Sequence, residues 1–211
     1  MNGFDQIELR GYGEVILTQG TQEILTVEAD EDMMSEIISD VRNRTLYLDV
    51  KNRHWMKNPL KTATNKIKYF ITMKNIQGLS ISGSGEITSE NIETDHLEIR
   101  ISGSGNVEIE SIQSYKLNMS ISGSGNCYLA GEVGSQKITI SGSGTYSGEH
   151  LDSDEAFIII SGSGDAAVWV KKNIDAQISG SGDVKYAGEA EDVFLKKSGS
   201  GTIRKIGGSW Q

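Results

Sequence analysis

Apolar and polar residues alternate along most of this chain with a period of two, which is typical of half-buried β-strands. The run Leu97-Glu98-Ile99-Arg100-Ile101 is one example. Five further strands are predicted before residue 79, at residues 7–9, 14–19, 24–28, 45–50 and 67–73. Between the third and fourth of these, residues 32–38 begin with an acid and carry apolar residues at helical spacing, which predicts one short helix.

The tetrapeptide Ser-Gly-Ser-Gly interrupts this alternation seven times. It begins at Ser82, Ser102, Ser122, Ser141, Ser161, Ser179 and Ser198. Successive starts lie 18 to 20 residues apart, a spacing too regular for low-complexity sequence. Each interval is therefore predicted to be one structural repeat.

The residue directly before the tetrapeptide is isoleucine in six repeats. These residues are Ile81, Ile101, Ile121, Ile140, Ile160 and Ile178. A repeat of this length cannot bury its apolar faces alone, so the repeats must stack, and parallel coiling places each isoleucine on the next. We predict an all-β parallel β-helix (a solenoid) forming a single domain over residues 1–211. Residues 79–211 would form seven Ser-Gly-Ser-Gly turns, and residues 1–78 the first strands and a cap.

The tetrapeptide has a structural explanation. Continued alternation from Ile81 points Gly83 and Gly85 inward, where glycine lets the wall bend around a narrow core. Ser82 and Ser84 then point outward and form stacked columns of hydroxyls. At the far end of the rod, Lys196, Lys197, Arg204 and Lys205 would discourage pairing of the last strand with another chain.

Composition excludes several classes of function. The formal net charge of −9 opposes binding to the phosphate backbone of nucleic acids. Cys127 is the only cysteine, so no intrachain disulfide or cysteine-based zinc site can form, and its inward position predicts a core residue. The chain has no apolar run long enough to span a bilayer and opens without the pattern of an export signal. We expect a cell-envelope or extracellular location with the signal removed, and a cytoplasmic location stays open.

Several segments together resemble the bacterial family of putative auto-transporter adhesins, head GIN domain, a domain of unknown function. The resemblance is carried by Gly3-Phe4 with Ile7 and Leu9, Val15 to Gly20, Leu46-Tyr47-Leu48, the Ser-Gly-Ser-Gly repeats, and Val184 to Gly188. It implies a right-handed β-helix that is usually exported, and it brings no catalytic residues. The chain departs from the family in lacking an export signal and in having Ala190 where proline is frequent.

The candidate chemistry is weak. A calcium-binding β-roll needs stacked aspartates, but the position after the tetrapeptide holds Glu86, Asn106, Asn126, Thr145, Asp165, Asp183 and Thr202. Asp152, Asp154 and Glu155 form an acidic group of the kind that polysaccharide-cleaving β-helices use, although a solvated corner between strands explains it better. The histidines His54, His96 and His150 have no ligand spacing. No metal, cofactor or catalytic residue is expected.

One segment has the composition of a contact surface. Residues 53–61 are basic and aromatic within an acidic protein, and Arg53, His54, Trp55 and Lys57 are the candidate partner contacts. A loop with Trp55 packed over the end of the rod is the alternative. The leading hypothesis for function is a non-catalytic surface binding or adhesion module for a protein or glycan. A self-associating scaffold comes second, and a polysaccharide-active enzyme third.

Overall fold

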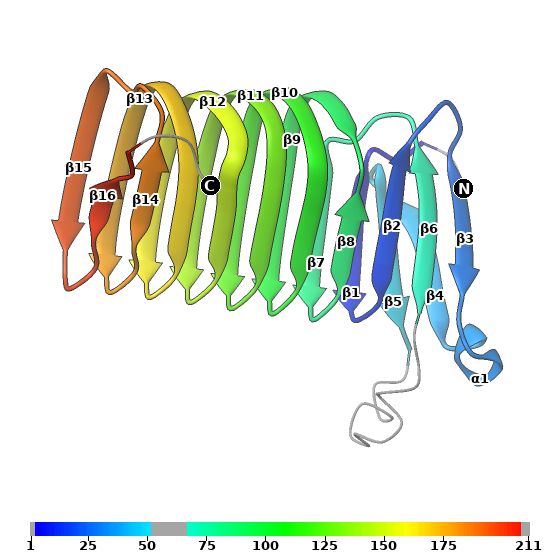
Figure 1. Ribbon diagram of the computed structural model, residues 1–211. Coiled ribbons are helices and arrows are strands. Elements are labelled where there is room, and N and C mark those ends of the chain that lie inside the picture. The colour runs from blue at the N-terminus through cyan, green and yellow to red at the C-terminus, as the bar shows by residue number, and fades with distance from the viewer. Residues whose placement is uncertain (1–2, 52–66, 208–211) are drawn as a thin grey trace.

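The computed structural model describes residues 3–51 and 67–207 and confirms the predicted class, an all-β solenoid of about six turns with one short helix. The chain coils into a rod, with the amino-terminal elements at one end and β15 and β16 at the other (Figure 1). The sixteen strands within these two ranges join one sheet. The elements before the repeats are β1 (Gln6–Gly11), β2 (Glu14–Gln19), β3 (Ile24–Glu28), α1 (Glu31–Met34), β4 (Ile37–Arg42), β5 (Thr45–Val50) and β6 (Lys68–Met73). The repeats form β7 (Gly78–Gly83), β8 (Glu86–Ser89), β9 (Ile92–Gly103), β10 (Asn106–Gly123), β11 (Asn126–Gly142), β12 (Thr145–Gly162), β13 (Asp165–Gly180), β14 (Val184–Ala187), β15 (Asp192–Ser198) and β16 (Ile203–Lys205).

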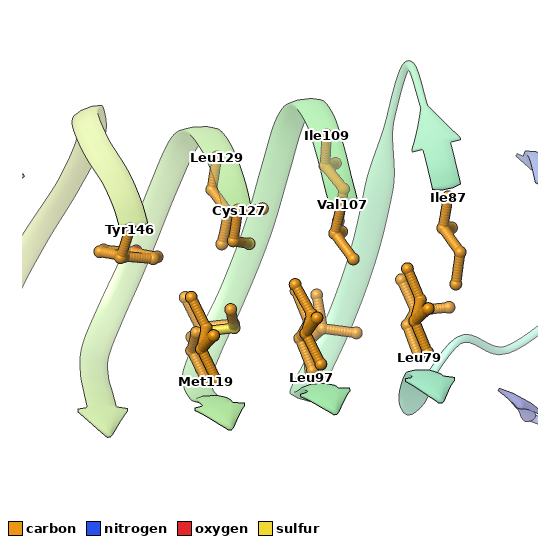
Figure 2. Packing of buried hydrophobic residues seen from close by; sticks show 14 of the residues in the cluster. Leu79, Ile87, Leu97, Val107, Ile109, Met119, Cys127, Leu129 and Tyr146 are labelled. Atoms are coloured by element: carbon orange, nitrogen blue, oxygen red, sulfur yellow. The ribbon is translucent and has the colours of Figure 1, made fainter. Parts of the chain in front are cut away.

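The apolar positions stack into columns, because successive turns pair in parallel and in register. Ile81 pairs with Ile101, and Ile101 with Ile121. The column continues through Ile140, Ile160 and Ile178, and all six side chains are at most 3% exposed. Side chains from opposite walls of the coil meet inside it, as Figure 2 shows for Leu79, Ile87 and their equivalents on later turns. The columns therefore form one continuous core along the rod.

The two glycines of each corner are required for different reasons. Gly103 has a φ of 128°, and a Cβ there would lie 2.5 Å from the carbonyl oxygen of Gly83 on the preceding turn. A Cβ on Gly105 would lie 2.5 Å from Cγ2 of Ile81. Only the second glycine of the corner is buried, so the prediction that the first also points inward is wrong. The first glycine is needed for its backbone angle and for close stacking of the corners.

The order of turns in space differs from their order in the chain at the amino-terminal end. Strand β1 lies between β5 and β7, and β2 lies between β6 and β8. Residues 10–13, with the sequence Arg-Gly-Tyr-Gly, form a corner equivalent to Ser-Gly-Ser-Gly, since Gly11 pairs with Gly83 and the amide of Ser84 donates to the carbonyl of Gly11 at 2.7 Å. The first two strands of the chain, β1 and β2, therefore form the second layer of the rod, and the later strands β5 and β6 form the layer before it.

The cap is made of strands that run against the solenoid direction. Strand β3 pairs antiparallel with β6, and β4 pairs antiparallel with β5. The predicted helix is present but shorter than expected: α1 ends at Met34, and Ile37 and Ile38 belong to β4. Apolar residues at these positions are compatible with either a helix or an edge strand. They form a strand here because they pair with β5.

In the part of the chain that the structure describes, no strand covers the carboxyl-terminal end of the rod. Strand β15 pairs with β13, and every residue of β15 is exposed. Val193 and Leu195 continue the inward columns of Ile174 and Ala176, yet they are 39% and 45% exposed. They stay exposed because, within the described residues, no further rung covers them.

A polar network crosses the core near the middle of the repeats. The hydroxyl of the fully buried Tyr146 donates to Oε1 of Gln136 at 2.8 Å, and Nε2 of Gln136 donates to the Ser153 hydroxyl at 2.7 Å. Ser153 in turn donates to the carbonyl oxygen of Trp169 at 2.7 Å. The small residues Cys127 and Ala166 flank Tyr146 in its column and leave room for the ring.

Candidate functional site

A groove of about 610 Å³ runs across several turns of the rod. It is lined by residues of β9, β10 and β11, which lie side by side in Figure 1, together with Gln19, Asn75, Gln77 and Asp154. The strand residues are Glu93, Thr94, Asp95, His96, Gln113, Ser114, Tyr115, Glu132, Val133 and Gly134. We refer to these residues as the polar groove, because amides and carboxylates make up most of the lining.

Tyr115 is the most exposed large apolar side chain of the described residues, at 78%. Its neighbours Ser114 and Lys116 pair with Val133 and Ser135, which places Tyr115 level with Gly134. A Cβ on Gly134 would lie 2.8 Å from the Tyr115 carbonyl oxygen, so that position cannot carry a side chain without a backbone shift. The neighbouring turn therefore has no side chain at the position level with Tyr115.

Gln19 fixes the amino-terminal end of the polar groove. Its side-chain amide donates to the carbonyl oxygen of Glu93 at 2.8 Å, and its Oε1 accepts from the Glu93 amide at 2.7 Å. The same amide also donates to the carbonyl oxygen of Lys74 at 3.2 Å. The Gln19 side chain thus supplies hydrogen bonds to the backbone of β9 that a neighbouring strand would otherwise make.

The carboxylates of the polar groove fall into two sets. Glu132 and Asp154 have cationic partners on β13, with Nζ of Lys171 3.3 Å from Glu132 and Nζ of Lys172 2.9 Å from Asp154. Glu93 and Asp95 form no side-chain hydrogen bond or ion pair with other described residues. Their oxygens are exposed and face the groove as unused acceptors.

The acidic group proposed from the sequence lies in a strand, so the prediction that it occupies a corner between strands is wrong. Asp152, Asp154 and Glu155 belong to β12. Asp152 shares Lys171 with Glu132 at 3.3 Å, and Glu155 accepts from Nδ2 of Asn173 at 3.0 Å. Asp152 and Glu132 raise the pKa of Lys171 through these contacts. Each carboxylate therefore has a partner on β13 that stabilises its charged form.

The position after the tetrapeptide forms a hydrogen-bonded polar ladder. Nδ2 of Asn126 donates to Oδ1 of Asn106 at 3.1 Å. Asp183 accepts from both the hydroxyl and the amide of Thr202 at 2.8 Å, and these bonds lower the pKa of Asp183. Oδ1 of Asp165 likewise accepts from the Asp183 amide at 2.8 Å, so hydrogen bonds join this position on neighbouring rungs.

The histidines and the cysteine do not form a site among residues 3–51 and 67–207. His96 lies 3.4 Å from the Asn118 amide, and His150 packs at an angle against Tyr128 with ring centroids 6.4 Å apart. Cys127 is 2% exposed, and burial raises the pKa of its thiol, as expected of a core residue. Within these ranges, no group of three or more potential ligands could hold a metal ion.

The basic and aromatic candidates Arg53, His54, Trp55 and Lys57 lie outside the described residues. The six isoleucines proposed as a structural ladder lie in the core, as given above. Sequence reasoning did not find the polar groove, because its lining comes from six separate segments. The available signal was Tyr115, an aromatic residue at an outward position between the inward Ser114 and Leu117. None of the described residues forms a helix with the length and apolarity of a membrane span.

Comparison with known proteins gives one family and several solved structures. Residues 3–190 match the family described as putative auto-transporter adhesin, head GIN domain. A putative adhesin from Bacteroides fragilis superimposes with a TM-score of 0.90 and 29% identity, covering 97% of this chain and 93% of that chain. A putative lipid binding protein from Parabacteroides distasonis gives 0.76 and 26%, covering 98% and 94%. A putative adhesin from the same organism also gives 0.76 but is 19% identical, covering 98% and 94%, and shows the fold alone. No curated protein matches.

Proposed function

Because the chain belongs to the family of putative auto-transporter adhesins with a head GIN domain, we propose that it is a non-catalytic binding module that engages its ligand through the polar groove. The family name points to the cell surface. The groove supports the proposal because it combines an exposed aromatic ring, Tyr115, with the carboxylates of Glu93 and Asp95, which have no side-chain partner among the described residues. A concave surface with a few convergent polar groups is typical of ligand sites.

A non-catalytic role accounts for the acidic residues of the rod. General acid and base catalysis by two carboxylates needs a pair whose environments separate their pKa values. Asp152 and Asp154 are instead neutralised by Lys171 and Lys172 at the surface. This pairing favours a structural role, in which the ion pairs join neighbouring rungs.

The relative named as a putative lipid binding protein raises lipid as a ligand class. The core of this chain is filled by stacked side chains, many of them fully buried. The polar groove is lined mainly by amides and carboxylates. Both features favour a polar ligand over an acyl chain.

The proposal is tested by incubating fluorescently labelled protein with an array of immobilised glycans and extracellular proteins. The wild type is expected to bind at least one immobilised ligand, and Tyr115→Ala to weaken that binding at least about tenfold, since exposed aromatic anchors dominate such contacts. Phe70→Ala is the matched control, because Phe70 is a 38% exposed aromatic on β6, which contributes nothing to the groove. Binding that Tyr115→Ala leaves unchanged would show that another surface is used.

A second candidate function is self-association, which the open end of the rod favours. Among residues 3–51 and 67–207, no strand pairs with the outer edge of β15, and Val193, Phe194 and Leu195 are 39%, 69% and 45% exposed. Exposed edges of this kind pair with other chains unless charge prevents it, and Lys196 and Lys197 on the same strand would oppose such pairing. Sedimentation velocity distinguishes the two candidates: a single monomer species excludes the scaffold, and a concentration-dependent series of oligomers supports it.

A further inference from the structure

Strand β15 lies at one tip of the rod, and the backbone groups of its outer edge are able to pair with another chain (Figure 1). Glu98 and Phe194 occupy the same position of successive turns, as the chain of parallel pairs shows. The Glu98 amide donates to the carbonyl oxygen of Gln77 on the preceding turn at 2.9 Å. The Phe194 amide therefore points toward β13. The backbone groups of Val193 and Leu195 point the other way, to an edge that no described strand covers.

The charges along this edge are arranged symmetrically about its centre. Residues 191–197 read Glu-Asp-Val-Phe-Leu-Lys-Lys, so two acids precede an apolar run and two cations follow it. All four charged side chains are exposed, and none forms a hydrogen bond or an ion pair with another described residue. A segment with this pattern is complementary to a second copy of itself that runs in the opposite direction.

One antiparallel register between two β15 strands places each acid opposite a cation. When Phe194 lies opposite the same residue of a second copy, Asp192 faces Lys196 and Glu191 faces Lys197. Each contact occurs twice, because a two-fold axis relates the copies. Opposite charges at directly opposed positions stabilise an antiparallel pair. The lysines that oppose edge pairing in other arrangements therefore favour it in this register.

The same register covers the exposed end of the core. Val193 of each copy lies opposite Leu195 of the other, with their backbone groups directed at the shared edge. Directly opposed residues lie on one face of a sheet, and both side chains continue the inward columns of Ile174 and Ala176. The apolar columns of the two rods would therefore meet, and the exposed parts of these side chains would be removed from water.

Neighbouring registers lack this match. A centre at Leu195 places Val193 opposite Lys197, and a centre at Val193 places Leu195 opposite Glu191. We propose that two copies of this chain form a two-fold symmetric dimer, tip to tip, through antiparallel β15 strands centred on Phe194. This inference rests on the self-association candidate and gives it a closed form in place of an open filament. It is separate from ligand binding at the polar groove.

The other edges at the tips of the rod match β15 less well. Strand β16 carries the exposed cations Arg204 and Lys205, so two copies would oppose like charges there. The outer edge of β4, at the opposite tip, has Asp40 and Arg42, which already pair with each other. The contact is therefore limited to one short strand from each copy. We expect a weak dimer, with a dissociation constant of about micromolar or above.

Sedimentation velocity of the purified chain over a wide range of concentrations tests the dimer. The wild type is expected to show a monomer–dimer equilibrium without larger species. Asp192→Lys and Lys196→Asp should each raise the dissociation constant at least about tenfold, because each sets like charges opposite each other twice. Glu110→Lys is the matched control, since it makes the same change of charge as Asp192→Lys at an exposed position of β10 and should leave the dimer unchanged.

Rescue experiments separate this register from a general effect of charge. The variants Asp192→Lys and Lys196→Asp repel their own copies but are complementary to each other, so an equimolar mixture should form dimers with close to wild-type affinity. The double variant should also dimerise like the wild type, because every opposed pair keeps opposite charges. Amide hydrogen exchange in β15 should slow at concentrations above the dissociation constant and stay fast in the dilute monomer.

The outcomes distinguish this inference from the broader candidates. A wild type that stays monomeric at every concentration overturns both the dimer and self-association. A continuing series of oligomers overturns the closed dimer and leaves self-association standing. A dimer that the single variants leave unchanged, that Glu110→Lys weakens equally, or that mixing does not restore overturns the register. Circular dichroism of each variant establishes that it is folded, and the test of the polar groove through Tyr115 is independent of all these results.

Discussion

A corner glycine is held by two restrictions at once, a backbone angle and a neighbouring carbonyl. Gly103 has a φ of 128° and stacks on Gly83 of the turn before it. Gly103→Ala is expected to lower the free energy of unfolding by at least about 2 kcal/mol. Alanine is strained at this positive φ, and its Cβ would clash with the carbonyl oxygen of Gly83. Urea denaturation measures the loss. Gly207→Ala is the control, because a Cβ there meets nothing within 4 Å and its effect should be close to zero.

The buried Tyr146 hydroxyl is expected to contribute measurably to stability. Tyr146→Phe leaves Oε1 of Gln136 without its donor inside the core. An unsatisfied buried acceptor costs about 1–3 kcal/mol, which should appear as a lower urea midpoint with an unchanged slope. Tyr115→Phe provides the comparison, since its hydroxyl is exposed and no change is expected. Equal stability of Tyr146→Phe and the wild type would show that the network adds nothing.

At the scale of the strand, position along the rod decides what an apolar side chain contributes. Ile138 and Leu195 belong to the same inward column, but Ile138 is fully buried and Leu195 is 45% exposed. Ile138→Ala is expected to cost about 2–5 kcal/mol, and Leu195→Ala less than about 1 kcal/mol. Thermal and urea unfolding of the two variants measure the difference. Similar losses would mean that the last rung is covered in solution.

At the scale of the whole rod, stability should fall toward the open end. Each rung contacts only its neighbours, so a terminal rung has one interface where an internal rung has two. Hydrogen–deuterium exchange is expected to be slowest in β10 to β12 and fastest in β15 and β16, where the residues are largely exposed. Exchange in β15 as slow as in β11 would indicate that association protects the end.

The sequence was sufficient to predict the solenoid because Ser-Gly-Ser-Gly and the preceding isoleucine recur at a near-constant interval. It did not identify residues 10–13 as a corner, since arginine and tyrosine replace the serines there. It also could not place Gln136 inside the core, because a polar residue at an inward position gains its partners only from other turns. The polar groove depends on the same kind of long-range pairing, and a single tyrosine was its only local sign.

The interleaved amino-terminal rung has a consequence for how the rod is assembled. The layer formed by β1 and β2 is contacted by β5 and β6 on one side and by β7 and β8 on the other. The first two strands of the described chain therefore become an internal layer of the rod. The strands of the capped tip, β3 to β6, all precede the repeats in the chain, so this tip can form before the long arm is synthesised.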